Sequence, residues 1–103
     1  MRREYRVLFN FEHKTLEGTM NHRPASCETL NISWTTEGGQ KITLGFRVTK
    51  LLPFKPVRDE NGNPAGGYHQ VNLEKLRDGH PLMGVKAIET TLLQPDRALQ
   101  PAS

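Results

Sequence analysis

The stretch that decides the fold runs from Thr29 to Thr49 and reads TLNISWTTEGGQKITLGFRVT. Apolar and polar residues alternate on both sides of the double glycine at positions 38 and 39, a pattern typical of two half-buried strands joined by a tight turn. With the turn centred on Gly38, a one-residue slip would set apolar against polar positions, so the register is strongly specified. Three apolar pairs then face each other: Trp34 with Ile42, Ile32 with Leu44, and Leu30 with Phe46.

Two further segments are predicted as strands. Every second residue is apolar over Tyr5–Glu12, which indicates a half-buried strand. The segment Val85–Leu93 fits either a helix or a strand, and the flanking Gly84 and Pro95 favour a strand. The intervening segment 13–26 shows no period and is interpreted as a long loop.

The chain changes character after Leu51, where prolines and glycines accumulate. The stretch 53–67 is predicted to be a long Pro/Gly-rich loop, or a loose hairpin with arms near 54–58 and 68–71 around the turn signal Asn61-Gly62. Asn72 and Gly79 resemble the caps of a short helix over 73–78.

These elements predict an α+β fold, with an antiparallel sheet of three to four strands, one short helix and a long Pro/Gly-rich loop. We expect one face of the sheet to pack on the helix, the proline-rich segment and the last strand. The strand at 5–12 or the one at 85–93 is expected to be an edge, which would be available for pairing with another chain as a homodimer.

The length of 103 residues allows one domain, predicted as residues 1–95 with a frayed tail at 96–103. The net charge of +3 permits contact with phosphate without implying it. Apolar runs are far shorter than the roughly 20 residues of a membrane span, and no secretory leader is evident. A lone cysteine, Cys27, excludes an internal disulfide, so a cytoplasmic protein is expected.

No sequence motif identifies a catalytic site, a metal site or a cofactor site. Asp59–Asn63 begins like a calcium loop, but Pro64 and Gln70 occupy positions that require glycine and glutamate, so a polar turn is the better interpretation. The histidines and Cys27 lack the spacing of a zinc site. We therefore expect no cofactor and no metal, and the sequence favours a protein that is not an enzyme while leaving enzymatic activity open.

One predicted surface, the outward face of the central hairpin and the segment that follows it, is unusual in its charge. Residues 41–58 contain five basic side chains and no acidic one, and the outward face of the central hairpin carries no carboxylate. Such a face can donate hydrogen bonds to an acidic protein surface or to phosphates, although a plain solvated sheet face explains it equally well. The residues predicted to contact a partner are Asn31, Ser33, Lys41, Thr43, Arg47, Lys50, Lys55 and Arg58.

Three functions follow as hypotheses. The first is a non-enzymatic binding module that docks on a larger macromolecule, preferably a protein, through a sheet face or edge strand; bacterial and phage accessory or inhibitor proteins are often of this size, which is an association only. The second is phosphate contact with nucleic acid through residues 41–58, but inward aromatic residues argue against stacking on bases. The third is a small hydrolase or nuclease whose base is one of four histidines: His13, His22, His69 or His80.

Overall fold

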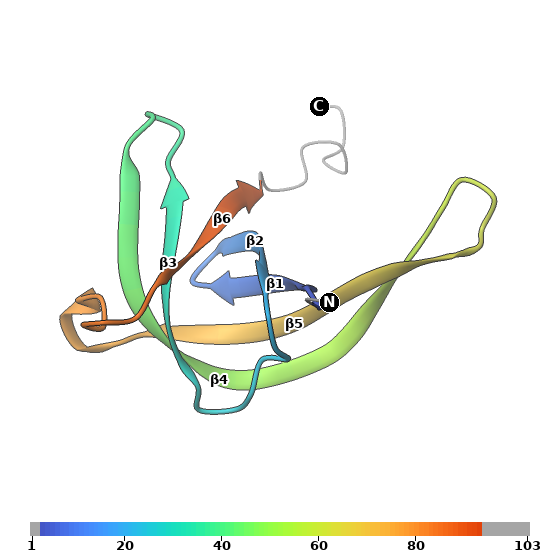
Figure 1. The fold of residues 1–103 in the computed structure, drawn as a ribbon. Helices are drawn as coiled ribbons and strands as arrows, with labels where there is room; N and C mark the ends of the chain where they lie inside the picture. Colours follow the sequence, from blue (N-terminus) through green and yellow to red (C-terminus); the bar gives the residue numbers. More distant parts are fainter. Residues whose placement is uncertain (1–2, 94–103) are drawn as a thin grey trace.

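The structure is a computed structural model that describes residues 3–93. Its strands are β1 (Tyr5–Phe11), β2 (Lys14–Met20), β3 (Thr29–Thr35), β4 (Lys41–Arg58), β5 (Pro64–Lys75) and β6 (Ala87–Leu93), and a three-residue 3₁₀ turn, η1 (Arg77–Gly79), precedes β6. They close into one barrel in the order β1-β2-β6-β3-β4-β5 (Figure 1). The prediction of an α+β fold with three to four strands is therefore wrong, because the described chain is almost entirely six-stranded sheet.

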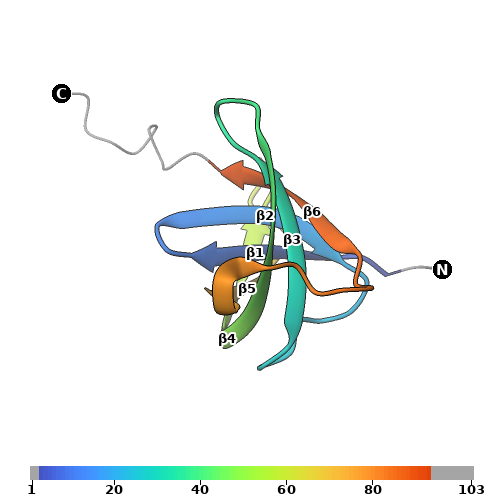
Figure 2. The ribbon, with the colours of Figure 1, turned by 90° about the vertical axis from the view of Figure 1, so that its left-hand side faces the viewer.

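The central hairpin has the predicted register. Strands β3 and β4 pair antiparallel with Trp34 opposite Ile42, Ile32 opposite Leu44 and Leu30 opposite Phe46. The backbone reverses at Gly39, which has a φ of 84°, and the two strands stand upright beside the rest of the barrel (Figure 2). The side-chain alternation along both strands was sufficient to fix this unit.

Two parallel pairings close the barrel. Strand β1 lies between β2 and β5, with its parallel contact to β5 running from Val7–His69 to Asn10–Asn72. Strand β6 lies between β2 and β3. The expectation that the strand at 5–12 or 85–93 is an edge is therefore wrong, because each of them has a neighbour on both sides. The choice of a strand rather than a helix for the last segment is confirmed.

The segment 13–26 is not the long loop that we expected, because β2 occupies its first half. Leu16 and Met20 point into the core, and between them the inward position is filled by Gly18. A Cβ atom on Gly18 would lie 2.8 Å from Cγ2 of Thr90 and 3.3 Å from the Glu89 carbonyl oxygen. Gly18 thus permits the close approach of β2 to β6. Because it has no apolar side chain, it also interrupts the alternation of apolar residues by which β2 could have been predicted.

The predicted helix at 73–78 is also wrong. Leu73 continues the inward alternation of Val71 and belongs to β5, which extends to Lys75. The chain then turns through η1, whose Asp78 has a φ of 63°. The expected packing of a sheet face on this helix is replaced by a core enclosed within the barrel.

The barrel encloses the hydrophobic core. Phe11 contacts both Trp34 and Phe46 edge-to-face, with ring centroids 5.7 and 4.7 Å apart respectively. No helix in residues 3–93 has the length and apolarity needed to cross a membrane. The buried core consists of Val7, Phe9, Phe11, Leu16, Met20, Leu30, Ile32, Trp34, Phe46, Val48, Val71 and Leu73.

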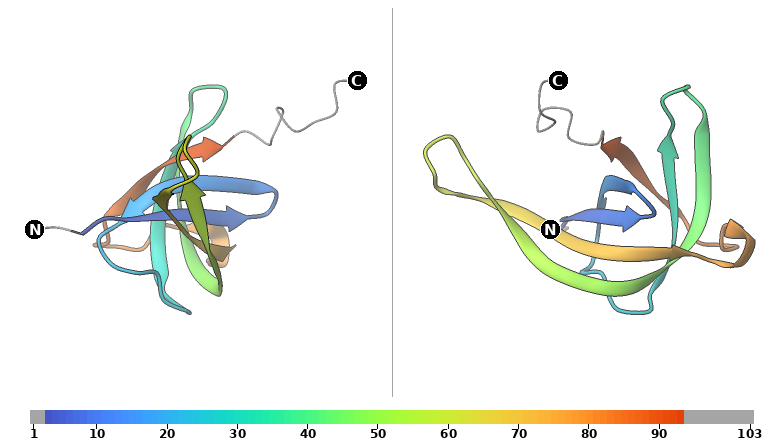
Figure 3. Two further views of the ribbon diagram at one scale, coloured as in Figure 1. Left: turned by 90° about the vertical axis from the view of Figure 1, so that its right-hand side faces the viewer. Right: turned by 180° about the vertical axis from the view of Figure 1, so that it is seen from behind.

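Strands β4 and β5 continue beyond the barrel as a hairpin, which we call the arm (residues 53–68), because β5 pairs with β1 only over His69–Asn72. It projects away from the other strands in Figure 1 and in the right-hand view of Figure 3. The long Pro/Gly-rich loop predicted over 53–67 is therefore wrong, because its two halves pair as strands. The alternative hairpin around Asn61-Gly62 is the one that forms, with Lys55 opposite Tyr68 and Pro56 opposite Gly67. Proline is tolerated here because β4 beyond Val48 has no strand on its second side among the described residues. The predicted frayed tail at 96–103 lies outside the described residues.

Candidate functional site

The predicted hairpin face is partly covered. Asn31 is 3% exposed and Ser33 is 1% exposed, so neither can meet a partner. The amide of Asn31 donates to the carbonyl oxygens of Leu82 (2.9 Å) and Val85 (2.8 Å) and accepts from the Leu82 backbone N–H (2.6 Å). The segment between η1 and β6 is therefore fastened across this face.

The rest of that face is not free of carboxylates. Ser33 and Thr43 share a hydrogen bond of 2.6 Å. Lys41 pairs with Glu89 at 2.9 Å, and Arg47 binds Glu74 through its Nε and Nη2 atoms. The bond with Glu74 raises the pKa of Arg47 above its usual value. The expected carboxylate-free plane is therefore wrong, because the neighbouring strands β5 and β6 supply acidic partners.

Of the other three predicted cations, Lys50 lies in the barrel wall opposite Asn72, and Lys55 and Arg58 belong to the arm. Lys50 and Lys55 are exposed and form no ion pair among residues 3–93. Arg58 donates to the carbonyl oxygen of Gly62 at 2.8 Å across the tip. At the tip, one carboxylate oxygen of Asp59 accepts from two backbone N–H groups of the turn, those of Asn61 and Asn63, each at 2.9 Å. The predicted partner-binding residues are thus divided between the barrel and the arm.

The arm exposes apolar side chains. Phe54 is 50% exposed on the arm, and Leu51 is 47% exposed at its base, where it lies opposite Val71 in the barrel wall. The ring of Phe54 lies against Gly67, where a Cβ atom would come within 2.5 Å of two ring carbons. Glycine at this position lets the ring lie flat on the opposite strand. Exposed large apolar groups on a projecting element are typical of an interaction surface.

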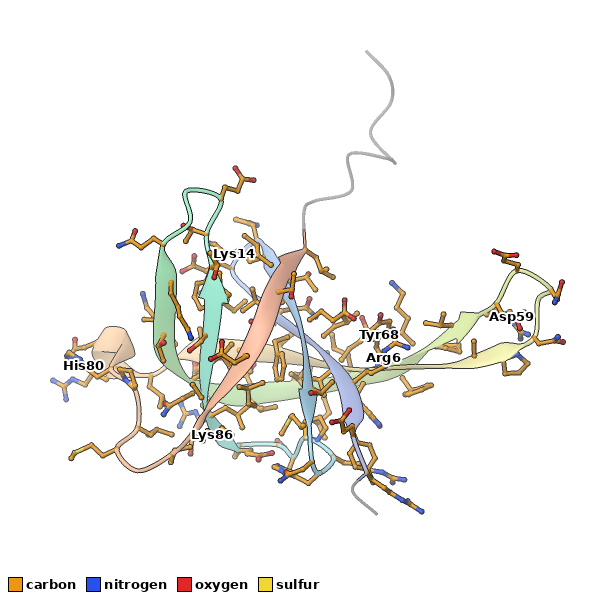
Figure 4. The ribbon with its side chains drawn as sticks, turned by 45° about the horizontal axis from the view of Figure 1, so that its top comes forward. Arg6, Lys14, Asp59, Tyr68, His80 and Lys86 are labelled. Carbon is orange, nitrogen blue, oxygen red and sulfur yellow. The ribbon has the colours of Figure 1, made fainter. Side chains whose placement is uncertain are left out.

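Three side chains from different strands fix the root of the arm. The guanidinium of Arg6 lies 4.2 Å above the ring of Tyr68 and donates to its hydroxyl. The Tyr68 hydroxyl in turn donates to Glu17 at 3.0 Å. Figure 4 shows Arg6 and Tyr68 side by side where the arm leaves the barrel, with Asp59 at the far tip and His80 at the opposite end of the molecule. This network joins β5 to β1 and β2.

A second cluster lies on the other side of the arm root. His69 contacts Tyr5 and Phe54 edge-on, with ring centroids 5.7 and 5.2 Å apart. The guanidinium carbon of Arg23 lies 5.9 Å from the Tyr5 ring centroid. The pKa of Tyr5 is lowered first by Arg3, through hydrogen bonding to the Tyr5 hydroxyl, and further by the charge of Arg23. The charges of Arg3 and Arg23 therefore both favour the Tyr5 phenolate.

An open groove of about 940 Å³ lies between the end of β2 and the start of β6. Met20, Leu30 and Ile88 are among its apolar lining residues, and His22 is the one histidine among the lining residues. His22 is held by Glu28 at 2.5 Å. Among the described residues, no three His, Cys, Asp or Glu side chains are grouped so that they could hold a metal ion.

Sequence reasoning missed Arg6, Tyr68 and Phe54. Tyr68 and Phe54 stood in a segment whose prolines and glycines obscured any alternation. The spacing of Phe54 and Tyr68 about the turn signal Asn61-Gly62 was an available indication that the two residues lie near each other in one hairpin. Nothing local in the sequence indicated that β1 would bring Arg6 to the same place.

Comparison with known proteins gives no further guide. No protein family, curated protein or solved structure matches this chain.

Proposed function

We propose that this protein is a non-enzymatic binding module that docks on a larger macromolecule through its arm. One observation carries the proposal: Phe54 is about half exposed on a hairpin that extends beyond the barrel, and Leu51 is about half exposed at the base of that hairpin. Side chains that neither fill the core nor cover it are available to a partner. The barrel then serves to hold the arm in a defined direction.

The arm root supports this role. Arg6, Tyr68 and Glu17 connect three strands at the point where the arm leaves the barrel. A hairpin fixed at its root loses less conformational entropy on binding than a free loop does. The arm is therefore suited to present its side chains before the partner arrives.

The faces of the arm are better suited to binding than its edges. Strand addition needs a row of free backbone N–H groups along an edge. Pro53 and Pro56 lack these groups, and the register with β5 shifts between Leu52 and Lys55 and again between Pro56 and Arg58. Prolines and bulges are typical protections against edge pairing. This geometry favours recognition by side chains and disfavours a homodimer formed through the arm edge.

Two classes of partner fit the arm. The exposed apolar side chains fit a protein, which the sequence also favours. The cations and the aromatic side chains near the arm root fit a nucleic acid. Both classes use the same arm, so the proposed function does not depend on which one is correct.

Site-specific photocrosslinking tests this proposal. Benzoylphenylalanine is placed at position 54 in one variant and at position 83 in another, because Met83 is 98% exposed and lies outside the arm. We expect a defined adduct in cells from position 54 and little from position 83, and digestion of the adduct with protease or nuclease identifies its class. Equal adducts from both positions, or none from position 54, would overturn the proposal.

A further inference from the structure

An aromatic row leads from the arm to the rim of the barrel. We define it as Phe54, His69 and Tyr5, whose rings follow one another with centroid separations of 5.2 and 5.7 Å. Phe54 is half exposed, and Tyr5 and His69 are half-buried. The row differs from the four aromatic residues that the sequence placed inward, all of which are buried in the core: Phe9, Phe11, Trp34 and Phe46.

Positive charge is concentrated at the rim end of this row. The guanidinium carbon of Arg23 lies 5.9 Å from the centroid of the Tyr5 ring, and Arg3 precedes Tyr5 by two residues at the same end of β1. Neither guanidinium forms an ion pair with a carboxylate in the described part of the chain, although Glu4 adjoins Arg3 in sequence. Two guanidinium groups without carboxylate partners are suited to bind phosphate, which accepts several hydrogen bonds at once.

We propose that the aromatic row and the two arginines form a binding surface for a single-stranded nucleic acid. A base stacks on the exposed ring of Phe54, and the adjacent phosphates meet Arg23 and Arg3. Alternating stacking and phosphate contact is how proteins hold single strands with little sequence preference. This inference rests on the proposed function of the arm, and it names the class of partner.

The chemistry of the surface selects the single strand over the other candidates. Bases in a duplex are already stacked on both faces, so the exposed ring of Phe54 can stack fully only on a base of an unpaired strand. A protein partner would use Leu51 and Phe54 alike, since both are about half exposed. A nucleic acid would depend on Phe54 and little on Leu51, because only the aromatic ring stacks on a base.

Fluorescence anisotropy with a labelled ten-nucleotide oligothymidylate tests the stacking step. We expect Phe54→Ala to weaken binding about fivefold or more, and Phe54→Tyr to preserve it, because each stacked base contributes substantially to affinity. Leu51→Ala is the matched control and should change the affinity by less than about twofold, since an aliphatic side chain offers no ring to a base. Circular dichroism checks that each variant is folded. Equal losses for Leu51→Ala and Phe54→Ala would overturn the proposal.

The salt dependence of the same binding tests the phosphate step. The double variant Arg3→Ala/Arg23→Ala should reduce the slope of log affinity against log salt by about 1.4, the value for two lost phosphate contacts on a single strand. The variant Lys75→Ala/Arg77→Ala removes the same charge from the end of β5 and from η1 and should leave the slope nearly unchanged. Equal changes in the two double variants would mean that only net charge matters and would contradict the proposal.

The two proposals can fail separately. If the wild-type protein does not bind the oligothymidylate and position 54 crosslinks to a protein, the nucleic-acid assignment is wrong and the arm keeps its function. If position 54 gives no adduct and the oligonucleotide still binds with no loss in Phe54→Ala, both proposals are wrong.

Discussion

The guanidinium of Arg6 lies 4.2 Å above the ring of Tyr68, and the two residues join the first strand of the barrel to the root of the arm. Removal of this contact should loosen the arm without unfolding the barrel. We expect Arg6→Ala to lower the unfolding free energy by about 0.5–1 kcal/mol, the value of an exposed cation–π contact. Hydrogen exchange of arm amides should also accelerate.

Lys14→Ala is the control for this prediction. Lys14 also lies over an aromatic ring, at 5.2 Å from the centroid of Phe11, but at the opposite end of the β1–β2 hairpin. Its removal should leave exchange in the arm unchanged. Faster exchange in the arm for both variants would show that the root contact has no special role.

Asn31 fastens the segment that precedes β6. Its buried amide makes three hydrogen bonds to Leu82 and Val85, and truncation leaves those backbone groups without their partner. We expect Asn31→Ala to lower the unfolding free energy by about 2–4 kcal/mol, measured by urea denaturation. Thr35→Ala, on the same strand and exposed, should cost less than about 0.5 kcal/mol. A similar small effect at Asn31 would contradict its fastening role.

Gly45 allows η1 and the residues after it to approach the sheet. A Cβ atom there would lie 2.6 Å from the carbonyl oxygen of His80 and 3.2 Å from Cδ1 of Leu76. Gly45→Ala should therefore destabilise the protein by about 1–3 kcal/mol through overpacking. Gly38→Ala meets open space and should be nearly neutral in the same thermal denaturation experiment. Comparable losses of melting temperature for both would refute the close-approach argument.

Tyr5 should lose its proton below the ordinary tyrosine pKa of 10.0, because Arg3 and then Arg23 favour the phenolate. Since the pKa is lower in the folded state than in the unfolded state, the stabilising contribution is present above pH 10 and is lost as pH falls through the folded-state pKa. Stability near pH 7 is accordingly independent of this group.

Absorbance titration at the phenolate band measures this shift. Tyr5→Phe should remove the component that titrates below pH 10, and Arg3→Ala should move that component towards 10. An unchanged titration in Arg3→Ala would show that the arginine does not act on the Tyr5 hydroxyl.

The local parts of the fold were predictable, and its closure was not. The double glycine and the alternation around it fixed the β3–β4 register, because both strands carry one apolar residue in two. Strand β2 was missed because Gly18 occupies an inward position where an apolar side chain was expected. Asn72 and Leu73 resembled a helix start, although Leu73 simply continues the inward face of β5.

The candidate site was only partly predictable for a similar reason. The alternation of apolar and polar residues in the hairpin correctly placed Trp34 and Phe46 inside. It could not indicate that Glu74 of β5 and Glu89 of β6 lie beside the outward face of the hairpin. The parallel contacts of β1 with β5 and of β3 with β6 join residues far apart in sequence. The contact of β1 with β5 brings Arg6 beside the arm root, and no local sequence pattern could reveal it.

Amide chemical-shift mapping tests the central claim most directly. Uniformly ¹⁵N-labelled protein is titrated with the oligothymidylate, and shifts are followed residue by residue. We predict that the largest changes occur in the arm, at Tyr5 and around Arg23, while the outward face of β3 and of residues 41–47 of β4 is unaffected. Changes confined to that outward face, or no changes in the arm at saturating oligonucleotide, would contradict the account.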